Sequence, residues 1–319
     1  MSTQNKVLLT GATGFVGRKL LTRLLDEKHA VAAAVRKSTV ELDKRAIQVV
    51  VPGLTAQTEW TSLAGQDVVI HSAARVHVMD EQSADPLAEF RKVNVEGSLR
   101  LARQAADAGV KRFIFISSIK VNGEGTAPGK PFTAFDEPAP QDPYGVSKME
   151  AEVGLRQVAE KTGMQVVIIR PVLVYGPGVK ANFRSMMNWM NKGVPLPLGA
   201  IHNKRSLVSL DNLVDLIVTC VDHLAAANQT FLVSDGEDLS TSDMLRRMAR
   251  ALGKPARLLP VPAAVLRGGA ALLGKGAVAQ RLCGSLQVDI RHTCETLNWA
   301  PPVSVDEGFR AAASAFLNE

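Results

Sequence analysis

A tyrosine and a lysine that could move a proton stand four residues apart in the segment DPYGVSKMEAE (142–152). The pattern from residue 144 onward predicts a helix, in which Tyr144 and Lys148 share one face with apolar residues at 151, 155 and 159. A free tyrosine, with a pKa of about 10, is a poor acid or base at neutral pH. A lysine ammonium close to the phenol favours the phenolate and lowers that pKa. The spacing therefore predicts a Tyr–Lys pair for acid–base catalysis.

Two serines close the apolar run RFIFISS (112–118), which predicts a buried strand. A hydroxyl at this position could stabilise a developing alkoxide. Because successive strand side chains point to opposite faces, only one of Ser117 and Ser118 can face a given site.

One polar residue interrupts an apolar helical stripe ahead of that strand. Asn94 shares a predicted helix face with residues 87, 90, 97 and 101. Its amide could be satisfied within the core, or it could hold a water or a backbone carbonyl near the site.

Three glycines follow the first predicted strand, KVLLT (6–10), and open a helix. Gly11 permits a tight turn, Gly14 lets a phosphate approach the backbone, and Gly17 lets helix and strand pack closely. The helix N-terminus then presents free N–H groups to a pyrophosphate. This strand–turn–helix context predicts a dinucleotide site.

The end of the second strand indicates which dinucleotide is bound. The segment AVRKST has Arg36 and Lys37 and no carboxylate. A guanidinium suits a 2′-phosphate, whereas a carboxylate would suit the free ribose hydroxyls of NAD. We expect NADPH, with Lys37 assisting as a point charge, and keep NAD as a possibility; a solvated basic loop is the alternative interpretation.

Short apolar runs alternate with helical patterns through the first half of the chain, which predicts a parallel sheet covered on both faces. The predicted strands are 6–10, 30–35, 47–51, 67–73, 112–118, 165–171 and, after a helix near 211–225, 230–235. The fold class is therefore α/β, a Rossmann-type doubly wound sheet with a smaller, mostly helical C-terminal substrate domain. We assign residues 1–172, plus about 207–235, to the first domain, and about 173–206 and 236–319 to the second.

The bulk composition is that of a globular protein with a mild excess of positive charge. The 319 residues are 46% hydrophobic and carry a formal charge of +6. Lys and Arg are dispersed, without basic runs and interleaved aromatics, so no nucleic-acid partner is expected. The excess charge could attract an anionic small substrate. The three cysteines, Cys220, Cys283 and Cys294, form no CxxC pair, so neither a disulfide framework nor a metal site is expected.

A late apolar segment, AAVLRGGAALLGKGAVAQRL (263–282), contains Arg267, Lys275 and Arg281 and is too interrupted to span a membrane. We expect a helical pair under the core, with contact to a membrane surface left open. No secretory signal precedes the first strand, and the free cysteines fit a reducing compartment, so we expect a cytoplasmic protein.

In this order, TGATGFVG, HSAA, NVEGSLRLARQA, RFIFISS, YxxxK and RPVLVYGPG resemble the extended short-chain dehydrogenase/reductase family, in its nucleotide-sugar epimerase/dehydratase branch. The resemblance covers nearly the whole chain. It implies a Rossmann domain with a Ser–Tyr–Lys site, a second domain that closes over a UDP-sugar, and a homodimer formed through the helices around 87–108 and 145–160.

The resemblance also carries site residues over by position. Ser118 falls at the catalytic Ser/Thr position, and Tyr144 and Lys148 fall at the acid–base pair, which leaves Ser117 as a strand-end packing or cofactor-side residue. The implied cofactor contacts are Gly11, Thr13, Gly14, Phe15, Val16, Gly17, Arg36, Ala73, Ala74 and Lys148. The implied substrate contacts are Arg75, Ser118, Lys120, Asn182 and Arg205.

The chain departs from the family pattern at several positions. Pro52, Gly53 and Leu54 stand where many members carry an aspartate that reads adenine. Asn122 replaces a tyrosine and Lys120 a small residue, and we expect both beside the sugar. Lys120 also stands where a 4,6-dehydratase would place an acid, which argues against dehydration.

Two reactions fit these residues, both by hydride transfer at the sugar C4. The segment SSIKVNGE resembles that of bacterial enzymes that reduce UDP-4-keto-6-deoxy-N-acetylglucosamine to UDP-N-acetylquinovosamine for O-antigen synthesis. We take this NADPH-dependent 4-keto reductase as the leading hypothesis and an NAD-dependent UDP-hexose or UDP-N-acetylhexosamine 4-epimerase as the alternative. A non-enzymatic dinucleotide sensor is the third possibility, and the intact Ser–Tyr–Lys set argues against it.

Overall fold

The computed structural model describes residues 4–76, 85–274 and 276–319. A central sheet of seven parallel strands has the order β3-β2-β1-β4-β5-β6-β9. Its strands are β1 (Lys6–Thr10), β2 (Ala30–Val35), β3 (Ile47–Val50), β4 (Val68–His71), β5 (Arg112–Ile116), β6 (Gln165–Pro171) and β9 (Thr230–Val233). All seven predicted strands are confirmed, and the Rossmann-like α/β fold is confirmed with them.

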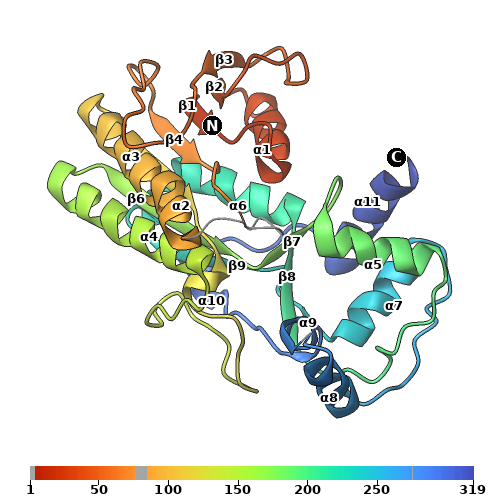
Figure 1. Cartoon of the computed structure of the whole chain (residues 1–319). Coiled ribbons are helices and arrows are strands. Elements are labelled where there is room, and N and C mark those ends of the chain that lie inside the picture. Colours follow the sequence, from red (N-terminus) through yellow and green to blue (C-terminus); the bar gives the residue numbers. More distant parts are fainter. Residues whose placement is uncertain (1–3, 77–84, 275) are drawn as a thin grey trace.

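Helices cover both faces of this sheet (Figure 1). Leu9 of β1 packs on one face with α1 and α6, while Leu8 packs on the other with α3 and α4. The helices before residue 163 are α1 (Phe15–Asp26), α2 (Pro86–Phe90), the π-helical turn η1 (Arg91–Gly97), α3 (Ser98–Asp107), the 3-10 turn η2 (Ile119–Val121) and α4 (Pro143–Thr162). The burial of the inner strands β1, β4, β5 and β6 follows from this double cover, whereas the edge strand β3 exposes Ile47 and Val50.

A second, three-stranded sheet has the order β10-β8-β7 and consists of β7 (Leu173–Tyr175), β8 (Arg205–Ser209) and β10 (Asp238–Leu239). The later helices are α5 (Ala181–Asn191), α6 (Leu210–Asp222), the turn η3 (Leu224–Ala226), α7 (Thr241–Ala251), α8 (Ala263–Leu272), α9 (Gly276–Cys283), α10 (Arg291–Leu297) and α11 (Val305–Leu317). A separate core, which includes Tyr175, Phe183, Leu245 and Phe309, joins α5, α7 and α11 to this sheet. Strand β8 pairs with β7 and β10, while its residue Val208 packs in the same core as the central strands.

The carboxyl ends of two central strands leave the sheet earlier than the apolar runs predicted. Strand β4 ends at His71 and β5 at Ile116. The serines beyond them bond elsewhere: the Ser72 hydroxyl donates to the Thr10 carbonyl over 2.7 Å, and the Ser117 hydroxyl donates to Glu152 over 2.5 Å. The strand order reverses between β1 and β4, and crevices at such a reversal are where doubly wound sheets bind ligands.

Candidate active site

The glycine turn after β1 has no room for side chains. Gly11 has φ +75°, and a Cβ there would lie 2.7 Å from the Ala73 nitrogen. A Cβ on Gly17 would lie 2.0 Å from the Gly11 carbonyl oxygen, which no side chain can do. The turn is therefore held against the loop after β4, where the predicted residues Ala73 and Ala74 lie half-buried.

The N-terminus of α1 is open to an anion. Gly14 occupies the capping position without a side chain to satisfy the first N–H groups, and the first turn has no acidic residue. Phe15 and Val16 begin the helix half-buried, and Thr13 is exposed, with its carbonyl accepting from Arg18 Nε over 3.0 Å. A backbone that approaches closely and an uncapped helix N-terminus fit a dinucleotide pyrophosphate.

Arg36 and Lys37 lie exposed immediately after β2. Neither makes an ion pair with a carboxylate in the described part of the chain. The cations that were predicted to read a ribose phosphate are therefore accessible from solvent.

Ser118 caps the short turn η2, with its hydroxyl accepting from the Lys120 N–H over 3.3 Å, and it is half-buried. Lys120 forms ion pairs with Glu124, over 3.1 Å, and with Asp142. Asp142 caps α4, which carries Tyr144. Burial lowers the pKa of Lys120, but its hydrogen bonds to Asp142 and Glu124 outweigh this and raise it above the ordinary value. Lys120 thus connects the Ser118 turn to the start of the helix that carries Tyr144.

Tyr144 lies in the first turn of α4, with its ring edge-on to Phe90 at 5.9 Å between centroids. Burial raises the pKa of Tyr144, and the neighbouring Asp142 charge raises it further. The expected lowering of this pKa by Lys148 is therefore wrong for this arrangement. Lys148 Nζ lies 6.0 Å from the tyrosine ring centroid, and desolvation of the phenolate outweighs its field.

Lys148 is 2% exposed. Its ammonium donates to the Ile116 carbonyl over 2.8 Å and lies 4.4 Å from the Phe115 ring centroid. Burial lowers the pKa of Lys148 to about 7, although the Glu152 charge acts in the opposite direction. Near neutral pH the lysine is thus close to half-protonated.

A buried polar network that the sequence did not reveal supports these residues. Arg170 donates to both carboxylate oxygens of Glu152, over 3.0 and 2.6 Å, and Glu152 also accepts from Ser117. Arg170 further donates to Asn122 over 2.9 Å, and Asn122 donates to the Thr133 carbonyl over 2.9 Å. Asn122 is therefore a buried structural residue and does not lie beside the sugar as predicted. The sequence could have indicated that Glu152 lies near the site, because Glu152 follows Lys148 by one helical turn and so shares its helix face.

Asn94 lies in η1 and is 1% exposed. Its side chain accepts from the Arg75 N–H over 2.8 Å and donates to the Arg75 carbonyl and the Ser147 hydroxyl, both over 3.0 Å. The two interpretations do not exclude each other, and both describe this geometry, since the amide is satisfied in the interior and holds the backbone of Arg75. The predicted substrate residue Arg75 is thereby fixed next to α4.

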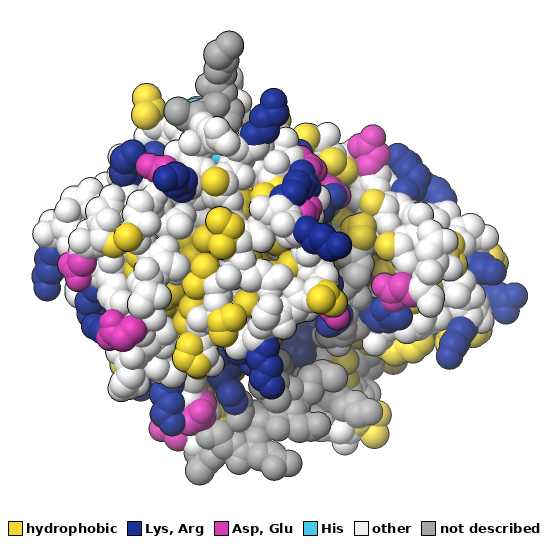
Figure 2. All heavy atoms as spheres, turned by 90° about the horizontal axis from the view of Figure 1, so that it is seen from above, with side chains coloured by type: hydrophobic (Ala, Val, Ile, Leu, Met, Phe, Trp, Pro, Cys, Tyr) yellow, Lys and Arg dark blue, Asp and Glu magenta, His cyan; other side chains and the backbone are white. Residues whose placement is uncertain are grey.

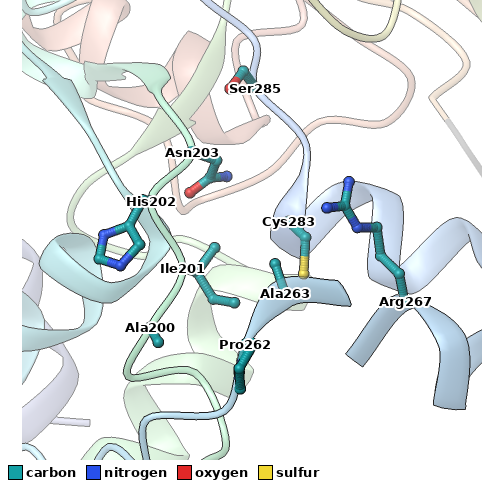
Figure 3. Close-up of a pocket in the computed structure, with 9 residues that line it drawn as sticks. All are labelled: Ala200, Ile201, His202, Asn203, Pro262, Ala263, Arg267, Cys283 and Ser285. Carbon is teal, nitrogen blue, oxygen red and sulfur yellow. The ribbon is translucent and has the colours of Figure 1, made fainter. Parts of the chain in front are cut away.

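A cavity of about 530 Å³ lies between the segment that precedes β8 and the helices α8 and α9. Figure 3 shows the segment 200–203 on one side and α8 on the other, with Cys283 between Ile201 and Arg267 and with Ser285 farther along the chain. Arg205 donates to the carbonyls of Arg281 and Gly284, each over 3.1 Å, and so holds the chain on either side of Cys283. The Thr126 N–H, in the loop after η2, donates to the Ser285 carbonyl over 2.9 Å. Asn182 lies exposed in the first turn of α5.

Within the described residues, no helix is long and apolar enough to cross a membrane. The same residues contain no group of three or more His, Cys, Asp or Glu placed to hold a metal ion.

Comparisons with known proteins agree with this arrangement. A model of the family described as NAD dependent epimerase/dehydratase matches residues 7–234. A protein named UDP-glucose 4-epimerase, from Vibrio cholerae, is 54% identical over 314 residues, covering 98% of this chain and 95% of the relative.

Solved structures show the same fold. UDP-N-acetylglucosamine 4-epimerase from Bacillus cereus matches with a TM-score of 0.78 and 19% identity, covering 98% of this chain and 99% of the other. UDP-glucose 4-epimerase from Thermotoga maritima, solved with UDP-glucose, matches with a TM-score of 0.76 and 23% identity over the same shares. At these identities the likeness concerns the fold.

Proposed function

Since this chain belongs to the NAD dependent epimerase/dehydratase family, we propose that it is a UDP-sugar 4-epimerase that uses a nicotinamide dinucleotide. The observation that carries the proposal is the 54% identity to a UDP-glucose 4-epimerase along almost the whole of both chains. It favours the epimerase, our alternative from the sequence, over the 4-keto reductase that we placed first.

The residues around the glycine turn fit the dinucleotide. The pyrophosphate would lie against Gly14 and the N–H groups that begin α1, with Ala73 and Ala74 beside it. When bound, the nicotinamide supplies an acceptor and donor of hydride.

The chain's own residues handle the proton at the sugar C4 hydroxyl. In the oxidative direction the Tyr144 phenolate takes this proton and in the reductive direction the phenol returns it, while the Ser118 hydroxyl donates a hydrogen bond to the same oxygen. Burial keeps Tyr144 protonated, so its use as a base requires a nearby positive charge. In the described arrangement the Lys148 ammonium, 6.0 Å from the ring centroid, does not offset the burial of the phenol, so it contributes only part of that charge; it also orients the nicotinamide ribose.

We propose the cavity beside α8 and the residues Arg205, Asn182, Arg75 and Lys120 as the region that receives the UDP-sugar. The division into a dinucleotide domain and a sugar-nucleotide domain, and a homodimer through α4 and the helices from α2 to α3, are part of the same proposal. A volume of about 530 Å³ is of the size that binding pockets for small molecules have.

One observation favours a second candidate, the NADPH-dependent 4-keto reductase. Arg36 is exposed where a carboxylate would suit NAD, and an epimerase regenerates its own cofactor without drawing on NADPH. Arg36→Ala should weaken NADPH by tenfold or more and leave NADH nearly unchanged, because a charge-assisted phosphate contact contributes about 1.5–3 kcal/mol. Fluorescence titration of each nucleotide measures this, and equal losses would exclude a phosphate contact.

The deciding experiment compares two substrates. The purified protein, given UDP-glucose without added nucleotide, should produce UDP-galactose, and Tyr144→Phe should not. Consumption of NADPH with UDP-4-keto-6-deoxy-N-acetylglucosamine, without interconversion of UDP-hexoses or UDP-N-acetylhexosamines, would refute the epimerase in favour of the reductase.

A further inference from the structure

Helices α8 and α9 expose apolar side chains that the sequence led us to place under the core. No residue of α8 is buried. Leu272 is 89% exposed, Leu273 74%, Val265 62% and Val278 50%. The expectation of a buried helical pair is therefore wrong.

The pair is nevertheless anchored to the protein. Ala263, Leu266 and Leu282 are partly buried and pack against the core of the second sheet. The two helices also contact each other, and Figure 1 shows them at the edge of the molecule opposite to β2 and β3. One side of the pair is thus fixed, and the other presents leucine and valine to solvent.

The surrounding segment has an unusual charge. The 45 residues from Met244 to Val288 contain eight Lys and Arg and no Asp or Glu. The remaining chain has 29 Lys and Arg against 31 Asp and Glu, so this segment accounts for the whole net charge of +6. On the face seen in Figure 2, which looks down on Figure 1 from the side away from α8, basic and acidic side chains are interspersed. Lys and Arg are dispersed within residues 244–288 as elsewhere, and the segment differs in having no acidic residue.

Several of these cations are available to a partner. The side chains at 250, 254, 257, 267 and 281 are exposed. None of them forms an ion pair with a carboxylate among the described residues. Arg246 and Arg247 are paired with carboxylates outside the segment, so the excess charge lies on the other cations. Exposed leucines together with unpaired cations are the composition of helices that lie at the surface of an anionic bilayer.

We propose that α8 and α9 bind this protein to the surface of an anionic phospholipid membrane. Leu272, Leu273, Val265 and Val278 enter the boundary between headgroups and acyl chains, while the basic side chains around them meet lipid phosphates. Helices of 10 and 8 residues are too short to span, so they lie in the plane of the interface. The inference goes beyond the proposed reaction and does not depend on it.

The test is sedimentation of the full-length protein with vesicles of phosphatidylglycerol and phosphatidylcholine, compared with vesicles of phosphatidylcholine alone. We expect at least about tenfold tighter binding to the anionic vesicles, with a loss of affinity as salt rises. The double variant Leu272→Glu, Leu273→Glu should bind about tenfold more weakly or worse, because it removes two apolar anchors and adds repulsion. The matched control is Leu224→Glu, which changes a leucine that is 87% exposed in η3, and it should bind like the wild type.

Thermal unfolding and turnover of a soluble UDP-sugar should be the same in the double variant and the wild type, which separates membrane binding from folding and from the proposed reaction. The proposal is overturned if the wild type ignores anionic vesicles, or if the double variant and the Leu224→Glu control bind equally. It is also overturned if the surface instead joins two copies, so that the double variant dissociates an oligomer and vesicle binding is absent throughout.

Discussion

The burial of Lys148 makes the stability of this protein depend on pH in a defined direction. The folded lysine has a pKa of about 7, because burial disfavours its ammonium, while an unfolded lysine keeps its proton up to a pH of about 10.4. Between these values the unfolded chain binds more protons than the folded one. The free energy of unfolding therefore rises with pH in this window.

The magnitude follows from the two pKa values. Where the unfolded chain binds one proton more than the folded protein, the free energy of unfolding rises by about 1.4 kcal/mol per pH unit. At pH 7 the folded lysine is only half-deprotonated, so the rise there is about half as steep. From pH 7 to pH 9 the gain is thus about 2 kcal/mol. Above pH 9 the buried Cys220, whose pKa burial raises to about 12, acts in the opposite direction, so the window closes there.

The assay is urea unfolding at pH 7, 8 and 9, followed by the fluorescence of the buried residues Trp60 and Trp299. Lys148→Met keeps a similar length and removes the titration, while all other groups titrate alike in both proteins. The wild type should gain about 2 kcal/mol relative to this variant across the range. Parallel pH curves for the two proteins would show that the lysine keeps an ordinary pKa in its site and would refute the reasoning.

Two further substitutions test the supports of the site. Gly17→Ala should abolish dinucleotide binding and lower the free energy of unfolding by about 3 kcal/mol or more, because its Cβ would lie 2.0 Å from the Gly11 carbonyl oxygen. The control is Gly268→Ala, which has open space around it and should change neither dinucleotide binding nor the free energy of unfolding. Glu152→Gln should lower the free energy of unfolding by about 3–5 kcal/mol, because it leaves the buried guanidinium of Arg170 without its charge partner. It should also lower the pKa of Lys148, since the Glu152 charge raises that pKa. An unchanged urea midpoint would contradict the first expectation.

The central sheet could be predicted from the sequence because its signals are local. Each strand is a continuous apolar run, and the glycine turn has a fixed spacing that only a strand–turn–helix unit explains. The face of α4 that carries Lys148, Ala151 and Leu155 was predicted for the same reason, since helical periodicity alone places these residues inward, and all three are buried.

The errors arise where contacts between distant segments decide the outcome. Asn122 was placed beside the sugar by motif position, but Arg170, 48 residues later, holds it in the interior. The pKa of Tyr144 was expected to fall from the Lys148 charge, yet the loss of solvent around the phenol has the larger effect. The α8–α9 pair has the composition of a buried segment, and only the packing of its other side shows that its leucines face outward.

The Glu152–Arg170 pair is better explained by the position of the site than by stability. Removing two charges from water offsets most of what a buried pair gains, so such a pair seldom stabilises a fold more than apolar residues would. Here its hydrogen bonds reach Ser117 at the end of β5, Asn122 after η2 and Glu152 on α4. These are the three segments that carry Ser118, Lys120 and the Tyr144–Lys148 pair. The buried pair therefore links the three segments by directed hydrogen bonds, with Arg170 bonded to Glu152 and Asn122, and Glu152 accepting from Ser117.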